Sequence, residues 1–101
     1  MTTSDSSSPA TDNASAPPVA IVTGGGTGVG RATALQLAAR GYRLVINYSR
    51  SQTEAEATAA EIQALGGHVQ CLQADVSSDA DCRRLADAAL QAFQRIDVLV
   101  N

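Results

Sequence analysis

The sequence predicts an α/β protein built on a doubly wound parallel sheet with the strand order 3-2-1-4. From residue 19 to residue 101, short apolar segments rich in β-branched residues alternate with longer segments of helical periodicity. Strands separated by helices of this length form βαβ units, whose right-handed crossovers place the strands parallel in one sheet. The predicted strands also lack a clean alternation of apolar and polar residues, which is typical of central strands covered on both faces.

The first three elements of the pattern are separated by glycine. Residues 19–23 (VAIVT) are apolar and mostly β-branched, which predicts a buried strand. Residues 29–40 form a predicted helix, and Gly41 follows where a helix commonly ends in the left-handed conformation. Its apolar side recurs at helical spacing, at Val29, Thr33 and Leu37. Residues 43–48 (RLVINY) form the second predicted strand.

Two further helices follow, each with a recognisable start. Ser51 and Glu54 form a predicted capping box, and Ser78 caps the next helix. The inner face of the first is predicted as Ala55, Ala59, Ile62 and Leu65, and that of the second as Cys82, Leu85, Ala89 and Phe93.

The last two strands are residues 68–73 (HVQCLQ) and residues 97–101 (DVLVN). The fourth strand has no partner beyond it, which leaves an apolar edge. We therefore expect the chain to be the amino-terminal part of a longer domain.

A polar tail precedes the predicted domain. Residues 1–18 consist mainly of Ser, Thr, Ala, Asp and Pro, and such a segment has no apolar face to offset the entropy of ordering. We expect these residues to be disordered and residues 19–101 to form one truncated domain. The tail lacks the basic and apolar regions of a secretory signal, and no segment of the chain approaches the roughly 18 apolar residues of a membrane helix.

Composition and charge exclude several classes of function. The 101 residues carry a net charge of −3, contain no lysine, and have their arginines interspersed with carboxylates. A nucleic-acid-binding protein normally presents a basic face, so we predict neither nucleic acid nor a membrane as partner. Cys71 and Cys82 have no metal-ligand spacing and are interpreted as small, reduced core residues. We therefore predict a cytoplasmic protein without a metal site.

A glycine-rich loop joins the first strand to the first helix. It runs from Thr23 to Gly30 (TGGGTGVG), with five glycines in its last seven positions. So few Cβ atoms let a bulky anion approach the backbone, and the following helix points unpaired N–H groups and its positive end at the same place. The loop therefore predicts a diphosphate-binding site, with a flexible glycine turn as the alternative.

Two other phosphate-loop patterns fail here. A Walker A loop requires Lys and Ser or Thr after its last glycine, whereas Arg31 and Ala32 follow here and the chain has no lysine. A P-loop phosphotransferase is thereby rejected. The strict G-x-G-x-x-G form also fails, because Val29 stands at its last position when it is counted from Gly24. Arg31 either lies near the phosphates or only occupies the first helical turn.

The spacing that fits is T-G-x-x-x-G-x-G, formed by Thr23, Gly24, Gly28 and Gly30. With it, the sequence resembles the short-chain dehydrogenase/reductase family. Three other segments agree: Asp75-Val76 after the third strand, residues 96–101 (IDVLVN), and residues 47–51 (NYSRS), the last in the manner of 3-oxoacyl carrier-protein reductases and glucose dehydrogenases. The resemblance implies a Rossmann-type NAD(P)-binding domain. The cofactor contacts we expect are Thr23, Gly24, Thr27, Gly28, Val29, Gly30, Tyr48, Ser49, Arg50, Asp75, Val76 and Asn101.

The tip of the second strand predicts a preference for NADP(H) over NAD(H). In such domains an acidic residue at this tip binds the ribose hydroxyls of NAD, whereas an Arg accommodates the 2′-phosphate of NADP. Tyr48 stands at the position of the acid, and Ser49 and Arg50 follow it. A hydroxyl and a guanidinium suit a dianionic group. The alternative is that Arg50 is a solvated loop charge.

The resemblance also implies chemistry that this sequence does not carry. The family transfers hydride between nicotinamide and a carbonyl or alcohol, using a Ser, a Tyr and a Lys four residues after the Tyr. Here Ile46 follows Tyr42 at that spacing, and Gln52 follows Tyr48. We therefore expect no catalytic residue within the chain, which would be the cofactor-binding part of an NADP(H)-dependent oxidoreductase. Homo-oligomers are expected only for a longer protein. The alternative function is a non-catalytic nucleotide-binding or interaction module.

Overall fold

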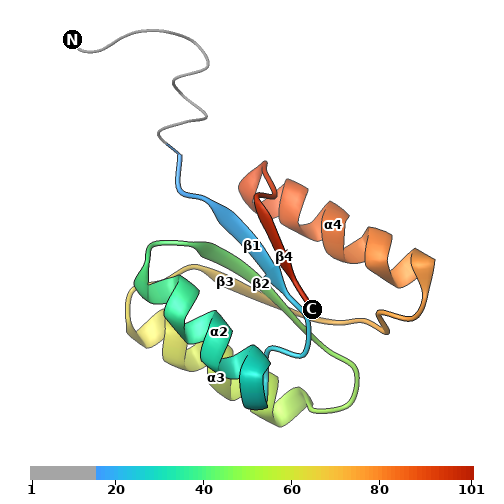
Figure 1. The fold of residues 1–101 in the computed structure, drawn as a ribbon, viewed down its shortest axis with the longest axis horizontal. Helices are drawn as coiled ribbons and strands as arrows, with labels where there is room; N and C mark the ends of the chain where they lie inside the picture. Colours follow the sequence, from blue (N-terminus) through green and yellow to red (C-terminus); the bar gives the residue numbers. More distant parts are fainter. Residues whose placement is uncertain (1–15) are drawn as a thin grey trace, which may run out of the picture.

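Residues 16–101 are described by a computed structural model and form one sheet with helices on both faces (Figure 1). The elements in chain order are β1 (Val19–Val22), α2 (Gly28–Ala39), β2 (Arg43–Tyr48), α3 (Gln52–Ala64), β3 (Val69–Gln73), α4 (Asp79–Phe93) and β4 (Val98–Val100). Every predicted strand and helix is present. Most of the predicted tail, residues 1–15, lies outside the described residues.

All strand pairs in the described residues are parallel, and the sheet has the predicted order β3-β2-β1-β4. Ile21 of β1 lies opposite Val45 of β2 on one side and opposite Leu99 of β4 on the other. The order reverses between β1 and β4: the chain moves outward in one direction through β2 and β3, then returns to pair β4 with β1. In sheets of this kind, ligands bind at the carboxyl ends of the strands beside such a reversal.

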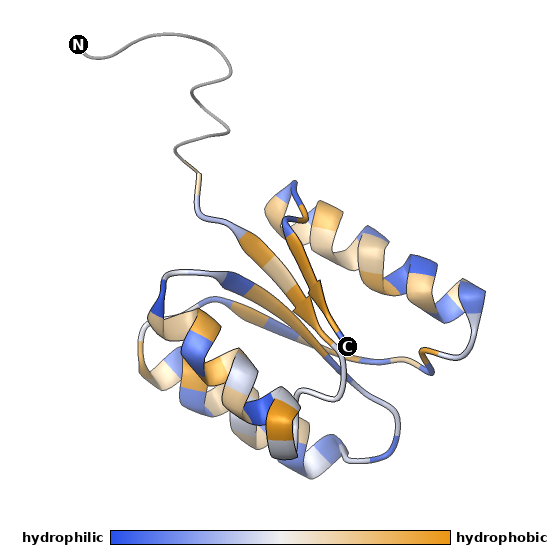
Figure 2. Cartoon of the chain, in the orientation of Figure 1, coloured by the Kyte–Doolittle hydropathy of each residue, from blue (hydrophilic) through white to orange (hydrophobic). Residues whose placement is uncertain are grey.

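The sheet is covered by two separate apolar clusters. Side chains of α2 and α3 pack on one face, where Leu44, Ile46 and Ile62 are fully buried. On the other face, Leu85 and Ala89 of α4 pack against Val45. Figure 2 shows β1 and β4 almost entirely in the hydrophobic colour, whereas β2 and β3 also carry hydrophilic segments. This double covering explains why the central strands β1 and β2 lack a clean alternation of apolar and polar residues. Phe93 packs against the second cluster, as predicted.

Two predicted inward positions are exposed instead. Val29 is 81% exposed, because it lies in the first turn of α2, and the inward residues of that helix are Ala34, Leu35, Leu37 and Ala38. Leu65 is 70% exposed, because α3 ends at Ala64 and the chain turns at Gly66.

Two further local predictions are wrong. Cys82 is exposed, and Cys71 is only partly buried. The predicted capping box does not form, because Ser51 has φ −91° and ψ 59° and its side chain accepts no hydrogen bond from the helix. An N-cap residue normally takes extended backbone angles, which aim its oxygen at the first turn. Ser78 has such angles, and its hydroxyl accepts from the Asp81 N–H, as predicted.

The outer strand β4 is anchored at its start by a carboxylate. Asp97 Oδ2 accepts from the Val19 N–H at 2.8 Å, and Arg95 binds both carboxylate oxygens of Asp97. Among the described residues β4 pairs only with β1, and Leu99 is 60% exposed. The predicted apolar edge is therefore present in the structure.

Candidate functional site

The predicted site residues come together at the carboxyl ends of the strands. The glycine loop follows β1, Tyr48, Ser49 and Arg50 end or follow β2, Asp75 and Val76 follow β3, and Asn101 follows β4. Because parallel strands end on the same side of the sheet, four segments distant in sequence share one edge (Figure 1). This edge includes the reversal of strand order between β1 and β4, where a ligand is expected.

The glycine loop has a shape that only glycine permits. Gly24 and Gly28 have φ of 64° and 55°, in the left-handed region that side chains rarely adopt. Gly30 has ordinary helical angles, but a Cβ placed on it would lie 2.0 Å from the Gly24 carbonyl oxygen. The loop therefore folds tightly back on the first turn of α2.

The amino terminus of α2 has no internal partner for its N–H groups. Thr27 precedes the helix with extended angles, yet its side chain makes no capping hydrogen bond, and the first turn contains no acidic residue. The Gly28, Val29 and Gly30 N–H groups have no backbone acceptor in the described part of the chain. In contrast, α4 is capped by Ser78 and has two aspartates in its first turn. An uncapped helix start without acidic residues favours an anion.

Asn47 is a site residue that the sequence analysis missed. Its side chain is buried, its Oδ1 accepts from the Gly24 N–H at 2.8 Å, and its Nδ2 donates to the Ala74 carbonyl at 2.7 Å. Its own carbonyl accepts from the Gly25 N–H at 3.1 Å. The signal was a single amide in an otherwise apolar strand, since a buried polar side chain must find partners.

Thr23 and Asn101 join the end of β1 to the end of β4. The Thr23 hydroxyl donates to the Val100 carbonyl at 3.1 Å and to Asn101 Oδ1 at 3.5 Å. The Thr23 N–H also bonds the Val100 carbonyl. These bonds hold the ends of β1 and β4 together at the point where the strand order reverses.

An open hollow of about 510 Å³ lies beyond the ends of β2 and β3 and is lined by Ser49, Arg50, Gln73 and Asp75. Arg50 forms no ion pair with a described residue, in contrast to Arg31, Arg84 and Arg95. Hydrogen bonds from the Ser77 hydroxyl and N–H hold the pKa of Asp75 below its ordinary value, and Arg50 contributes to this lowering. The hollow is thus lined by a cation, Arg50, and by a carboxylate, Asp75.

A second, mostly apolar cavity of about 400 Å³ lies between β4 and α4. The predicted residues Thr23, Val76 and Asn101 line it, together with Ile21, Cys82, Leu85, Ala86, Ile96 and Leu99. Six of the twelve predicted residues therefore line one of two spaces: Ser49, Arg50 and Asp75 line the polar hollow, and Thr23, Val76 and Asn101 line the apolar cavity. An amphipathic ligand with an apolar ring and charged groups suits this division.

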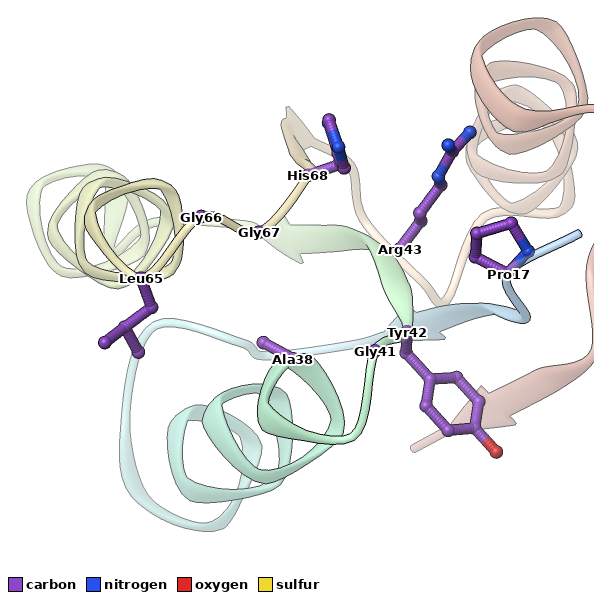
Figure 3. A pocket seen from close by; sticks show the side chains of 9 residues that line it. All are labelled: Pro17, Ala38, Gly41, Tyr42, Arg43, Leu65, Gly66, Gly67 and His68. Atoms are coloured by element: carbon purple, nitrogen blue, oxygen red, sulfur yellow. The ribbon is translucent and has the colours of Figure 1, made fainter.

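Arg31 pairs with Glu61 of α3, which shows it bound on the helix surface and not directed at the loop. At the other end of the sheet, a small cavity of about 190 Å³ is lined by residues that include Tyr42, Arg43 and His68. Figure 3 shows that the Tyr42 ring leaves β2 on the side opposite to the Arg43 and His68 side chains. Because these side chains point in different directions, they do not form a site comparable to the one at the carboxyl ends of the strands.

Two surveys of the described residues bear on other classes of site. No group of three or more His, Cys, Asp or Glu side chains in residues 16–101 is placed to hold a metal ion. Within the same residues, no helix has the length and apolar character to cross a membrane.

The fold defines a Rossmann-type α/β protein. The sequence model of the short chain dehydrogenases matches residues 18–101. The short-chain dehydrogenase/reductase homolog YusS of Bacillus subtilis is 47% identical over 83 residues, which cover 82% of this chain and 76% of that protein. A 3-oxoacyl-[acyl-carrier-protein] reductase of Synechocystis is 49% identical over 82% of this chain and 34% of its own length. The chain therefore belongs to the short-chain dehydrogenase/reductase family.

Solved structures agree with this assignment. A short chain dehydrogenase from Burkholderia cenocepacia in complex with NADP superposes with a TM-score of 0.80 at 40% identity, covering 83% of this chain and 34% of that one. A family member from Burkholderia phymatum in complex with NAD has a TM-score of 0.78 at 37% identity, covering 83% and 30%. The chain thus spans three quarters of YusS but about a third of the other relatives described here.

Proposed function

We propose that residues 19–101 form the cofactor-binding region of an NADP(H)-dependent short-chain oxidoreductase. One observation carries this proposal: the uncapped start of α2 and the unpaired Arg50 flank the same carboxyl edge of the sheet. The helix start suits the diphosphate of a dinucleotide, and Arg50 suits an additional phosphate. The proposed contacts are Thr23, Gly24, Thr27, Gly28, Val29, Gly30, Tyr48, Ser49, Arg50, Asp75, Val76 and Asn101.

The polar hollow gives the adenosine end of the cofactor an orientation. A phosphate placed against Asp75 would face a carboxylate whose pKa is lowered, so it would be repelled near neutral pH. We place the 2′-phosphate on the side of Ser49 and Arg50, and the adenine amino group at Asp75. Val76, which lines the apolar cavity, then packs against the adenine ring.

The preference for NADP(H) rests on the tip of β2. Tyr48 is the last residue of this strand and carries no carboxylate that would repel a 2′-phosphate. The complex of the Burkholderia cenocepacia relative with NADP supports this choice, and the complex of the Burkholderia phymatum relative with NAD supports the opposite one. Titration of this chain is required to decide between them.

The reaction we propose is hydride transfer between nicotinamide and a carbonyl or alcohol, as the family and the name of the Synechocystis reductase suggest. When bound, the reduced cofactor would donate the hydride to a carbonyl, and the oxidised cofactor would accept it from an alcohol. The residues of this chain bind and orient the diphosphate and adenosine, and the chain itself contains no Lys that could follow a Tyr. The cytoplasmic location and the homo-oligomer of a longer protein stay predictions. A non-catalytic nucleotide-binding module is the alternative, and binding without turnover in the longest natural form would favour it.

The experiment is calorimetric titration of the chain with NADP⁺ and with NAD⁺. Hydrogen bonds to charged groups contribute about 1.5–3 kcal/mol, so Arg50→Ala should weaken NADP⁺ binding about tenfold or more and leave NAD⁺ binding unchanged. Arg40→Ala is the matched control, because Arg40 caps the opposite end of α2 and is exposed. Equal losses for both cofactors in Arg50→Ala would refute the NADP(H) preference, and absence of binding by the unaltered chain would refute the function.

A further inference from the structure

Asn47 joins three chain segments with one buried side chain. It belongs to β2, accepts from the Gly24 N–H of the glycine loop, and donates to the Ala74 carbonyl just after β3. Only Asn47 and Thr58 are buried polar residues among those the structure describes. Thr58 bonds the Glu54 carbonyl inside its own helix. Asn47 is thus the buried polar side chain of the described residues that links separate elements.

The bond to Gly24 determines how the loop begins. Gly24 has φ 64°, and its N–H points at Asn47 Oδ1 at 2.8 Å. The next N–H, that of Gly25, points at the Asn47 carbonyl. Both donors are therefore used inside the protein. The N–H groups without a backbone acceptor among the described residues begin at Gly26 and continue through Gly30 in the first turn of α2. Asn47 thereby decides which N–H groups of the loop are open to an anion.

The bond from Asn47 Nδ2 to the Ala74 carbonyl holds the segment that follows β3. Ala74 is fully buried, and Asp75 and its hollow follow directly after it. The Ala74 N–H bonds the Tyr48 carbonyl, so the ends of β2 and β3 are held together on both sides of Asn47. The Asn47 side chain is therefore bonded both to the glycine loop and to the residue that precedes the hollow.

We propose that Asn47 is a positioning residue that holds the diphosphate loop in register with the adenosine side of the cofactor site. This inference rests on the proposed function, since it concerns the same cofactor. The amide is required because it accepts at one atom and donates at the other, at 2.8 Å and 2.7 Å. An aspartate at this position would keep the acceptor for Gly24, but its second oxygen would face the Ala74 carbonyl without a proton to share.

The test compares Asn47→Ala, Asn47→Asp and the control Thr58→Ala in the 101-residue chain. The control removes a part-buried hydrogen bond, from the Thr58 hydroxyl to the Glu54 carbonyl, in which no loop residue is donor or acceptor. Asn47→Ala should weaken NADP⁺ and NAD⁺ alike by about tenfold or more, because both carry the diphosphate. Binding of 2′-AMP, which lacks the diphosphate, should stay within about twofold. Hydrogen exchange at the Gly24 amide, followed by NMR, should accelerate in Asn47→Ala and not in Thr58→Ala.

The Asn47→Asp variant adds a second measurement, the pH dependence of NADP⁺ affinity. This dependence is not expected if Asn47 only stabilises the fold. A protonated carboxylic acid accepts at one oxygen and donates at the other, so it reproduces the amide. Burial disfavours the charged form, so this proton should be taken up at accessible pH. The ratio of its NADP⁺ affinity to that of the unaltered chain should rise as the pH falls from about 8 to about 5.

The outcomes separate the two proposals. If the unaltered chain binds neither dinucleotide, the proposed function fails. If it binds, and folded Asn47→Ala binds NADP⁺ within about twofold of it, the positioning role alone fails. An equal loss in Thr58→Ala, or an Asn47→Asp affinity ratio that does not change with pH, also overturns the positioning role.

Discussion

Replacing Gly30 by Ala should destabilise the protein although Ala is the better helix former. Gly30 lies in the first turn of α2 with ordinary helical angles, and Ala is favoured over Gly inside a helix by about 1 kcal/mol. A Cβ at Gly30, however, would lie 2.0 Å from the Gly24 carbonyl oxygen and 2.7 Å from its carbon. Since atoms in contact normally lie about 3.5 Å apart, the Gly24 carbonyl would have to move by roughly 1.5 Å.

The size of this displacement determines how much stability the Gly30→Ala variant should lose. Overpacking costs about 1–3 kcal/mol, and a displacement of a backbone carbonyl belongs in the upper part of this range, about 2–3 kcal/mol. After subtraction of the helix-propensity gain of about 1 kcal/mol, the net loss of stability should be about 1–2 kcal/mol. For a domain of this size each kcal/mol lowers the Tm by about 4–8 °C. The same movement should pull the Gly24 N–H away from Asn47, so cofactor affinity should fall by about tenfold or more.

The assay combines urea unfolding, followed by circular dichroism, with calorimetric titration of NADP⁺. Gly41→Ala is the matched control: Gly41 has φ 90°, no atom would approach its Cβ within 4 Å, and it lies beyond the other end of α2. Its left-handed conformation should cost about 1–2 kcal/mol, but cofactor affinity should be unchanged. If the free energy of unfolding of Gly30→Ala is unchanged or higher, the gain in helix propensity outweighs any clash with the Gly24 carbonyl. That result would refute the tight packing of the loop.

Two other predictions concern the start of β4 and the apolar cavity. Hydrogen bonds from Arg95 and from the first N–H of β1 lower the pKa of Asp97, so its stabilising contribution should be present above the ordinary carboxyl pKa of about 4 and be lost as the pH falls through the lowered value. Asp97→Asn should therefore lower the free energy of unfolding at neutral pH and flatten its decline in acid, as measured by urea unfolding against pH. An unchanged acid profile would contradict this. Burial, and to a smaller extent a nearby glutamate, raise the pKa of the Cys71 thiol, so the exposed Cys82 should react first with a thiol reagent. NADP⁺ should slow that reaction, because Cys82 lines the same cavity as Val76, and equal rates with and without NADP⁺ would place the adenine elsewhere.

Local sequence was sufficient for the fold and for the centre of the site. The apolar strands and the helices between them predict parallel βαβ units, because a segment that is hydrophobic on both faces is stable only when covered on both. The order β3-β2-β1-β4 follows this prediction. The position of the glycine loop could also be predicted from the sequence, since five glycines between Gly24 and Gly30 permit a backbone conformation that other residues rarely adopt. Whether that ligand is NADP(H) stays a prediction.

The remaining features depended on contacts between segments distant in sequence. Helical spacing placed Val29 inside, but its position relative to the sheet left it exposed. Ser51 had the right residue type for a cap, yet the turn after β2 gave it backbone angles that aim its hydroxyl elsewhere. Asn47 appeared as one polar residue in a strand, and only the approach of Gly24 and Ala74 gave its amide two partners. Sequence by itself thus determined which segments are buried and where the glycine loop lies, because these follow from periodicity and from glycine. The tertiary structure decided which polar groups meet, because a hydrogen bond requires two atoms to be within about 3 Å of each other, and no local pattern encodes that distance.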